Sequence, residues 1–112
     1  MPAYNRIDRI SEEVKKELSN VVRDLKDPRI TTVVSVVNVK VTKDLKFAKA
    51  YISVFGDEKA QKGVLDALKS ASGFIRREIG RRINLRNTPE LTFELDNSIE
   101  YGAHINQVLK NL

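Results

Sequence analysis

Apolar side chains recur every three or four residues over the first quarter of the chain, which is the spacing of one face of an α-helix. The positions that share this spacing are Ile7, Ile10, Val14, Leu18, Val21, Val22 and Leu25. Proline lacks an amide hydrogen and disfavours the helical conformation in the residue before it, so this helix should end near Asp27-Pro28-Arg29. The pattern therefore predicts a long amphipathic helix followed by a turn.

Apolar and polar positions then alternate over residues 31–42 and again over 47–55, which is typical of strands with one buried face. The apolar positions are Val37, Val39 and Val41 in the first run and Ala48, Ala50, Ile52 and Val54 in the second. Only the short polar segment 43–46 separates the two runs. We therefore expect an antiparallel hairpin.

Helical spacing returns after Asp57, which is the predicted N-cap. The first apolar stripe consists of Val64, Leu65, Leu68 and Ala71, and a second, in a different phase, consists of Ile75, Ile79 and Ile83. The change of phase predicts two helices separated by a kink at Ala71-Ser72-Gly73. Because glycine lacks a Cβ, we expect Gly73 to hold a left-handed or crowded conformation there, so that valine at this position would damage the fold.

A third alternating run, over residues 91–96, predicts a strand, and the last residues predict a short C-terminal helix. The apolar positions are Leu91, Phe93 and Leu95 in the strand and Ile99, Ile105, Val108, Leu109 and Leu112 in the helix. The order is helix, strand, strand, helix, helix, strand and short helix. We expect residues 1–112 to form a single α+β domain in which helices cover one face of a three-stranded sheet. The strand order is left open.

The composition, with 41% hydrophobic and 31% charged residues among 112, is ordinary for one soluble globular domain. No stretch approaches the roughly 20 apolar residues of a membrane span, and the N-terminus lacks the apolar region of a secretory signal. A cytoplasmic location is expected. The chain has no cysteine, and its single histidine, His104, cannot build a multi-histidine metal site.

Motifs that would carry catalysis are missing from the sequence. It contains no Walker-type phosphate loop, no Rossmann glycine fingerprint and no HExxH. The neighbouring acids Glu12 and Glu13, and Glu94 with Asp96, have the spacing of solvated surface positions. We therefore expect a protein that is not an enzyme and needs no cofactor, metal or small-molecule substrate.

The positive charge is concentrated in one quarter of the chain. Of the 20 basic and 15 acidic residues, the segment 62–86 holds seven and two, which leaves thirteen of each elsewhere. The whole net charge of +5 therefore lies in this segment, which indicates a polyanionic partner. Its basic residues, the candidates for RNA contact, are Lys62, Lys69, Arg76, Arg77, Arg81, Arg82 and Arg86.

Helical geometry separates the arginines of the third helix. If its isoleucines face the core, Arg77 and Arg81 point outward, where their guanidinium groups would pair with phosphate. Arg76 and Arg82 flank the buried stripe, so RNA contact and packing along apolar surface are equal alternatives for them. Gly80 is costly inside a helix, and the preferred explanation is close packing by a neighbouring segment.

Three aromatic residues share one face of the second strand, namely Phe47, Tyr51 and Phe55. Rings on a sheet surface can stack RNA bases. The preferred interpretation is nevertheless that these rings belong to the core or cover its edge. Under either interpretation, three lysines close to the rings could still contact phosphate, namely Lys40, Lys46 and Lys49.

Several strings, taken in this order over nearly the whole chain, resemble the ribosome-binding factor A family. They are Asp27-Pro28-Arg29, the segments 50–57, 73–80 and 85–93, and then Asp96, Ser98, Glu100-Tyr101-Gly102 and Ile105. The family has the type II K-homology fold, whose element order is the one predicted above. K-homology proteins usually clamp nucleotides with a Gly-x-x-Gly loop. Here Ala71-Ser72-Gly73 is instead similar to the alanine-x-glycine kink of the family.

The resemblance implies a monomeric assembly factor that binds the 30S ribosomal subunit or its precursors. It also implies help with maturation of the 5′ end of 16S rRNA and a role in cold adaptation. The alternatives are a generic single-stranded nucleic-acid module, a hydrolase or transferase with an unrecognised site, and a scaffold whose basic helix docks an acidic protein. The module would bind short oligonucleotides, and the scaffold would keep its affinity in high salt.

Overall fold

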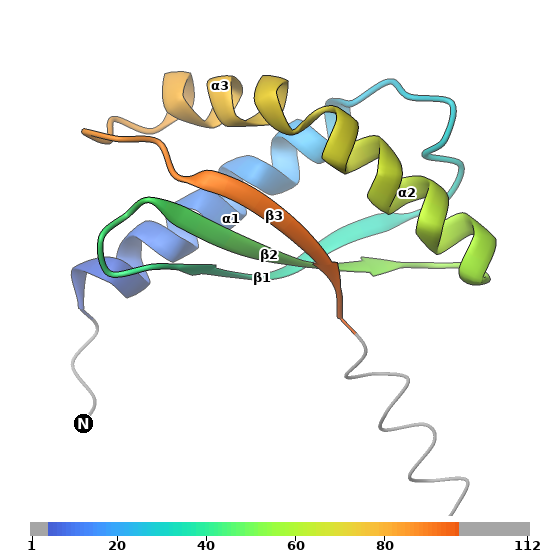
Figure 1. Ribbon diagram of the computed structural model, residues 1–112, viewed down its shortest axis with the longest axis horizontal. Helices are drawn as coiled ribbons and strands as arrows, with labels where there is room; N and C mark the ends of the chain where they lie inside the picture. Colours follow the sequence, from blue (N-terminus) through green and yellow to red (C-terminus); the bar gives the residue numbers. More distant parts are fainter. Residues whose placement is uncertain (1–4, 97–112) are drawn as a thin grey trace, which may run out of the picture.

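Three helices lie on one face of a three-stranded sheet (Figure 1). The computed structural model describes residues 5–96. The elements, in order, are α1 (Arg6–Asp24), β1 (Val34–Val41), β2 (Phe47–Val54), α2 (Glu58–Ser70), α3 (Ser72–Arg82) and β3 (Glu90–Leu95). The predicted α+β order is confirmed for this part of the chain. The predicted C-terminal helix, with His104, lies outside the described residues.

The sheet has the order β1-β2-β3, with β1 antiparallel and β3 parallel to the central strand β2. The two connections explain these directions, because a short turn can join only antiparallel strands, whereas a parallel neighbour needs a long crossover. Figure 1 shows α2 and α3 following one another above the sheet as that crossover.

The turn between β1 and β2 is held by side-chain hydrogen bonds, and Leu45 within it has a φ of 62°. The Asp44 carboxylate accepts hydrogen bonds from Thr42 Oγ1 at 2.6 Å and the Lys46 amide at 3.0 Å, which lower the pKa of Asp44.

A β-bulge in β1 changes which residues face the core. Val36 pairs with Ile52 and Asn38 pairs with Tyr51, so one extra residue, Val37, is inserted. Such an insertion shifts the alternation by one position. The prediction that Val37 points inward is therefore wrong, because Val36 is buried instead and Val37 is exposed.

A single hydrophobic core fills the space between the sheet and the helices. Its most completely buried large side chains include Val14 and Leu18 of α1, Ile52 of β2 and Leu68 of α2, followed by the isoleucines of α3. No polar or charged residue within 5–96 is buried. The opposite face of the sheet therefore carries the polar and aromatic residues of the alternating pattern, with no described element packed on it.

The aromatic residues of β2 are not in the core. Phe47 is 50% exposed and Phe55, just past the end of the strand, is 78% exposed. Tyr51 is half-buried on the same open face. The interpretation that these rings belong to the core is therefore wrong, whereas the alternative that they cover its edge stays a prediction. The small residues Ala48 and Ala50 are buried on the helix-covered face instead.

The break between α2 and α3 lies at Ala71. Asp57 caps α2 as predicted, with its carboxylate accepting a hydrogen bond from the Ala60 amide at 2.9 Å. Ala71, at φ −90° and ψ 6°, occupies the bridge region between the two helices. Gly73 lies in the first turn of α3 without a left-handed φ, and a Cβ there would meet only the Arg77 side chain, at 3.9 Å. The expectation of a left-handed or crowded Gly73 is wrong, because the chain changes direction two residues earlier.

Candidate nucleic-acid interface

Helix α3 directs two arginines away from the core, because Ile75 and Ile79 are buried on its inner side. Arg77 is exposed, and its guanidinium makes no hydrogen bond or ion pair within residues 5–96. Arg81, whose side chain is 79% exposed, lies 3.1 Å from Glu78 Oε1. An exposed ion pair of this kind contributes little free energy, so an incoming phosphate can compete for Arg81.

Arg76 holds the loop between α3 and β3. Its Nε and Nη2 donate hydrogen bonds to the Thr88 carbonyl oxygen at 3.1 and 2.9 Å. Gly80, one turn further along α3, allows the same loop to approach, since a Cβ there would lie 2.6 Å from Thr88 Oγ1. This close contact confirms that Gly80 serves packing. The contact that the structure shows for Arg76 is thus a hydrogen bond to the backbone, which is neither of the two alternatives named for it, RNA contact and packing along apolar surface.

Arg82 connects α3 with α1. Its Nη1 lies 3.5 Å from Glu17 Oε2, and its Nε lies 3.7 Å from Glu78 Oε2. Two carboxylates therefore balance this guanidinium. Arg82 contributes to the packing of the two helices more directly than to an anion-binding surface.

The remaining cations of segment 62–86 are exposed on α2 and on the loop after α3. Lys62 and Lys69 are seven residues apart, which places them on the same side of α2. Asp66 lies between them, and Arg86 belongs to the loop that Arg76 holds. Some exposed cations of this segment have no hydrogen-bond or ion-pair partner on another element among residues 5–96. We call them the outer cations, namely Lys62, Lys69, Arg77, Arg81 and Arg86.

Arg29 is a cation beside the helix break that charge analysis missed. The Asp27 carboxylate accepts hydrogen bonds from the Arg29 amide at 2.8 Å, from Nε at 3.1 Å and from Nη2 at 2.8 Å. These bonds lower the pKa of Asp27 to about 2, and the same contact raises the pKa of Arg29. Arg29 Nη1 also donates to Ser70 Oγ at 3.3 Å. Local charge could not reveal this site, because the turn reaches α2 only through folding.

The turn approaches α2 at a second point. The Arg29 carbonyl oxygen lies 3.5 Å from the position that a Cβ on Gly63 would occupy. The local sequence predicts only a helix stop at Asp27-Pro28-Arg29, which is also one of the strings that resemble the family. The turn is also a brace that holds the C-terminal end of α2, next to Ala71.

Within the described range 5–96, no three histidine, cysteine, aspartate or glutamate residues are grouped so that they could hold a metal ion. None of the helices in that range combines the length and apolarity needed to cross a membrane.

The family comparison agrees with the arrangement of these elements. The sequence model for ribosome-binding factor A matches residues 6–109. The chain belongs to the ribosome-binding factor A family. A ribosome-binding factor A of Clostridium botulinum strain Hall is 59% identical over 111 residues, which cover 98% of this chain and 92% of the relative. A ribosome-binding factor A of Clostridium novyi is 57% identical over the same shares of both chains.

Solved structures of the family have the same fold. The crystal structure of ribosome-binding factor A from Thermus thermophilus matches with a TM-score of 0.72 at 26% identity, over 81% of this chain and 97% of that one. The solution structure of a candidate ribosome-binding factor A from Thermotoga maritima matches with a TM-score of 0.77 at 30% identity, over 89% and 95%. A homology model of the Thermus thermophilus factor, fitted into the cryo-electron-microscopy map of a 30S complex, matches with a TM-score of 0.66 at 28% identity, over 78% and 91%.

Proposed function

We propose that this protein binds free 30S ribosomal subunits or their precursors in the cytoplasm and assists maturation of the 5′ end of 16S rRNA, without catalysing a reaction itself. The observation that carries the proposal is family membership, together with the placement of the Thermus thermophilus relative in a 30S complex. Growth in the cold is the condition under which we expect its loss to matter most.

The outer cations supply the binding chemistry in this proposal. Guanidinium groups pair with phosphate oxygens through two parallel hydrogen bonds, and each phosphate neutralised releases condensed counterions. Arg77 needs no rearrangement to do so, because it has no competing partner in the described part of the chain. Arg81 must only leave a weak surface pair with Glu78.

The junction between α2 and α3 favours recognition of a structured particle over a nucleotide clamp. A single residue, Ala71, separates the end of α2 from the start of α3. There is consequently no loop between these helices of the kind that wraps phosphates in K-homology domains. We expect weak binding to short unstructured RNA and tighter binding to the assembled subunit.

Sedimentation with purified 30S, 50S and 70S particles at two salt concentrations tests the proposal. We expect selective association with free 30S subunits that weakens as salt increases. Equal binding to all three particles would show only general phosphate affinity. A salt-independent association would instead indicate a protein partner for the basic segment. Comparable affinity for a short unstructured RNA would favour the generic nucleic-acid module.

Charge reversal of two outer cations tests whether these residues bind the 30S subunit. The double variant Arg77→Glu/Arg81→Glu should weaken 30S binding and lower the slope of log K against log salt by about 0.7 to 0.9 for each phosphate that is no longer neutralised. The matched control is Arg6→Glu/Arg9→Glu, which makes the same charge change on exposed positions at the start of α1. Equal weakening in both variants would mean that net charge, not the surface of α3, determines binding.

A further inference from the structure

The open face of the sheet carries two lysines side by side between two aromatic rings. Lys40 of β1 and Lys49 of β2 are direct partners in the antiparallel ladder, and both are exposed. Phe47 and Tyr51 lie two residues to either side of Lys49, and therefore on the same face. No described helix covers this face.

Packing of the sheet does not account for the lysine pair. Like charges directly opposite one another in a ladder are destabilising. Lys49 Nζ is 3.4 Å from Glu94 Oε1 on β3, which balances one of the charges. Lys40 Nζ instead lies 5.8 Å from the centroid of the Tyr51 ring and has no carboxylate partner among the described residues. A β-branched residue would suit position 40 of the strand better.

The residues around the lysine pair are mainly basic near the turn that joins β1 and β2. Segment 40–49 contains four lysines and a single acid, Asp44, and its lysines are Lys40, Lys43, Lys46 and Lys49. The open face also has a shallow depression of about 290 Å³, lined by both rings, both ladder lysines and Thr92. Acidic residues occur along β3 and just past its end, namely Glu90, Glu94 and Asp96, and Asp96 lines a neighbouring hollow with Lys40 and Tyr51. A polyanion would therefore follow β1 and β2 and avoid β3.

We propose that this surface is a second RNA contact, at which Phe47 and Tyr51 stack unpaired bases while Lys40 and Lys49 contact the flanking phosphates. Exposed rings interleaved with cations are the combination that single-stranded nucleic acid requires. The inference rests on the proposed function, because the RNA would be an unpaired segment of the bound ribosomal particle. It adds a contact on the side of the sheet opposite the helices.

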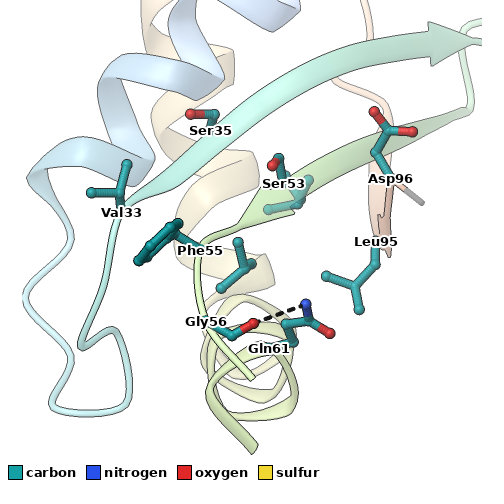
Figure 2. Close-up of a pocket in the computed structure, with 10 residues that line it drawn as sticks. Val33, Ser35, Ser53, Phe55, Gly56, Gln61, Leu95 and Asp96 are labelled. Atoms are coloured by element: carbon teal, nitrogen blue, oxygen red, sulfur yellow. Dashed lines mark hydrogen bonds between the residues drawn. The ribbon is translucent and has the colours of Figure 1, made fainter. Parts of the chain in front are cut away.

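The third ring of the aromatic series provides a matched control. Phe55 is more exposed than Phe47 but lies past the end of β2, in a different hollow. Figure 2 shows it beside Val33, Ser35 and Ser53, with Gly56 and Gln61 further along the same hollow. No lysine is among the residues of 5–96 that line that hollow. Phe55 therefore exposes a larger fraction of its ring than Phe47 but lacks the neighbouring cations that would bind phosphate.

The first experiment compares 30S binding of Phe47→Leu/Tyr51→Leu with that of Phe55→Leu. We expect the double variant to bind about tenfold more weakly or worse, because each stacked base contributes appreciably to affinity, and Phe55→Leu to bind like the wild type. The variant Phe47→Tyr/Tyr51→Phe keeps both rings and should keep the affinity. Thermal unfolding of each variant checks the fold. Equal binding by the double variant and the wild type would overturn the proposal.

Two further measurements test the second RNA contact even if Phe47→Leu/Tyr51→Leu folds poorly. Lys40→Gln alone leaves the core untouched and should weaken binding and lower the salt slope. A photo-crosslinking residue, p-benzoylphenylalanine, in place of Phe47 should react with 16S rRNA in the 30S complex. Reaction only with a ribosomal protein or within the chain itself would overturn the inference while leaving 30S binding intact. Absence of wild-type binding to 30S subunits would instead overturn the proposed function.

Discussion

The guanidinium of Arg76 donates two hydrogen bonds to the carbonyl oxygen of Thr88, one from Nε at 3.1 Å and one from Nη2 at 2.9 Å. This contact fastens the loop after α3 to the helix itself. The next residue, Pro89, is buried and leads directly into β3. One side chain therefore stabilises the path between α3 and the parallel strand, and with it the position of Arg86.

Replacing Arg76 with glutamine should lower the free energy of unfolding by about 1 kcal/mol, because the Thr88 carbonyl loses its donors. The neighbouring substitution Arg77→Gln is the matched control, and it should change stability by less than about 0.5 kcal/mol, since Arg77 has no described partner. Urea denaturation measures both values. The order should be reversed for 30S binding, which Arg77→Gln should weaken more. Equal stability of the two variants would argue against the role of the loop contact.

Alanine at position 80 should destabilise the protein even though alanine normally stabilises a helix interior by about 1 kcal/mol relative to glycine. The reason is that its Cβ would lie 2.6 Å from Thr88 Oγ1. In a Thr88→Ala background the obstruction is gone, so Gly80→Ala should then be stabilising. A double-mutant cycle measured by chemical denaturation determines this coupling. Additive effects of the two substitutions would contradict the close contact.

At position 73 the opposite result is expected. Gly73→Ala should raise the free energy of unfolding by about 0.5 to 1 kcal/mol, because Gly73 is in a helical turn where a Cβ would make only an ordinary van der Waals contact with Arg77. Thermal denaturation of Gly73→Ala and Gly80→Ala, measured in parallel, shows at which of the two positions the fold requires glycine. Destabilisation by Gly73→Ala would restore the idea that the family kink requires glycine.

Acidification should weaken the hydrogen-bonded ion pair between Asp27 and Arg29. The pKa of Asp27 is lowered from 3.8 to about 2 in the folded protein, chiefly by side-chain hydrogen bonding with Arg29. The unfolded chain therefore takes up the proton first as the pH falls, so the stabilisation is complete above about pH 4 and is lost as the pH approaches 2. The stability advantage of wild type over Asp27→Asn should shrink over this interval. An advantage that is the same at pH 7 and pH 2 would contradict the assignment.

Local periodicity predicted most of the elements, because spacing along the chain reports directly which side of a helix or strand is apolar. The isoleucines of α3 and the small residues of β2 were placed correctly for this reason. Val37 was misplaced, because a bulge arises from pairing with β2 and leaves no clear local signal. The rings of β2 were misjudged as well, since periodicity groups residues on a face but does not say which face the helices cover.

By itself, the sequence determined the αββααβ order, the concentration of positive charge in residues 62–86 and the outward direction of Arg77 and Arg81. Only the tertiary structure separated the cations that we propose to bind RNA from those that hold the fold. Arg76, Arg82 and Arg29 meet Thr88, Glu17 and Ser70, which are distant in the chain. The physical reason is that charge and periodicity are local properties of the chain, whereas a guanidinium becomes structural only when folding brings an acceptor within hydrogen-bonding distance.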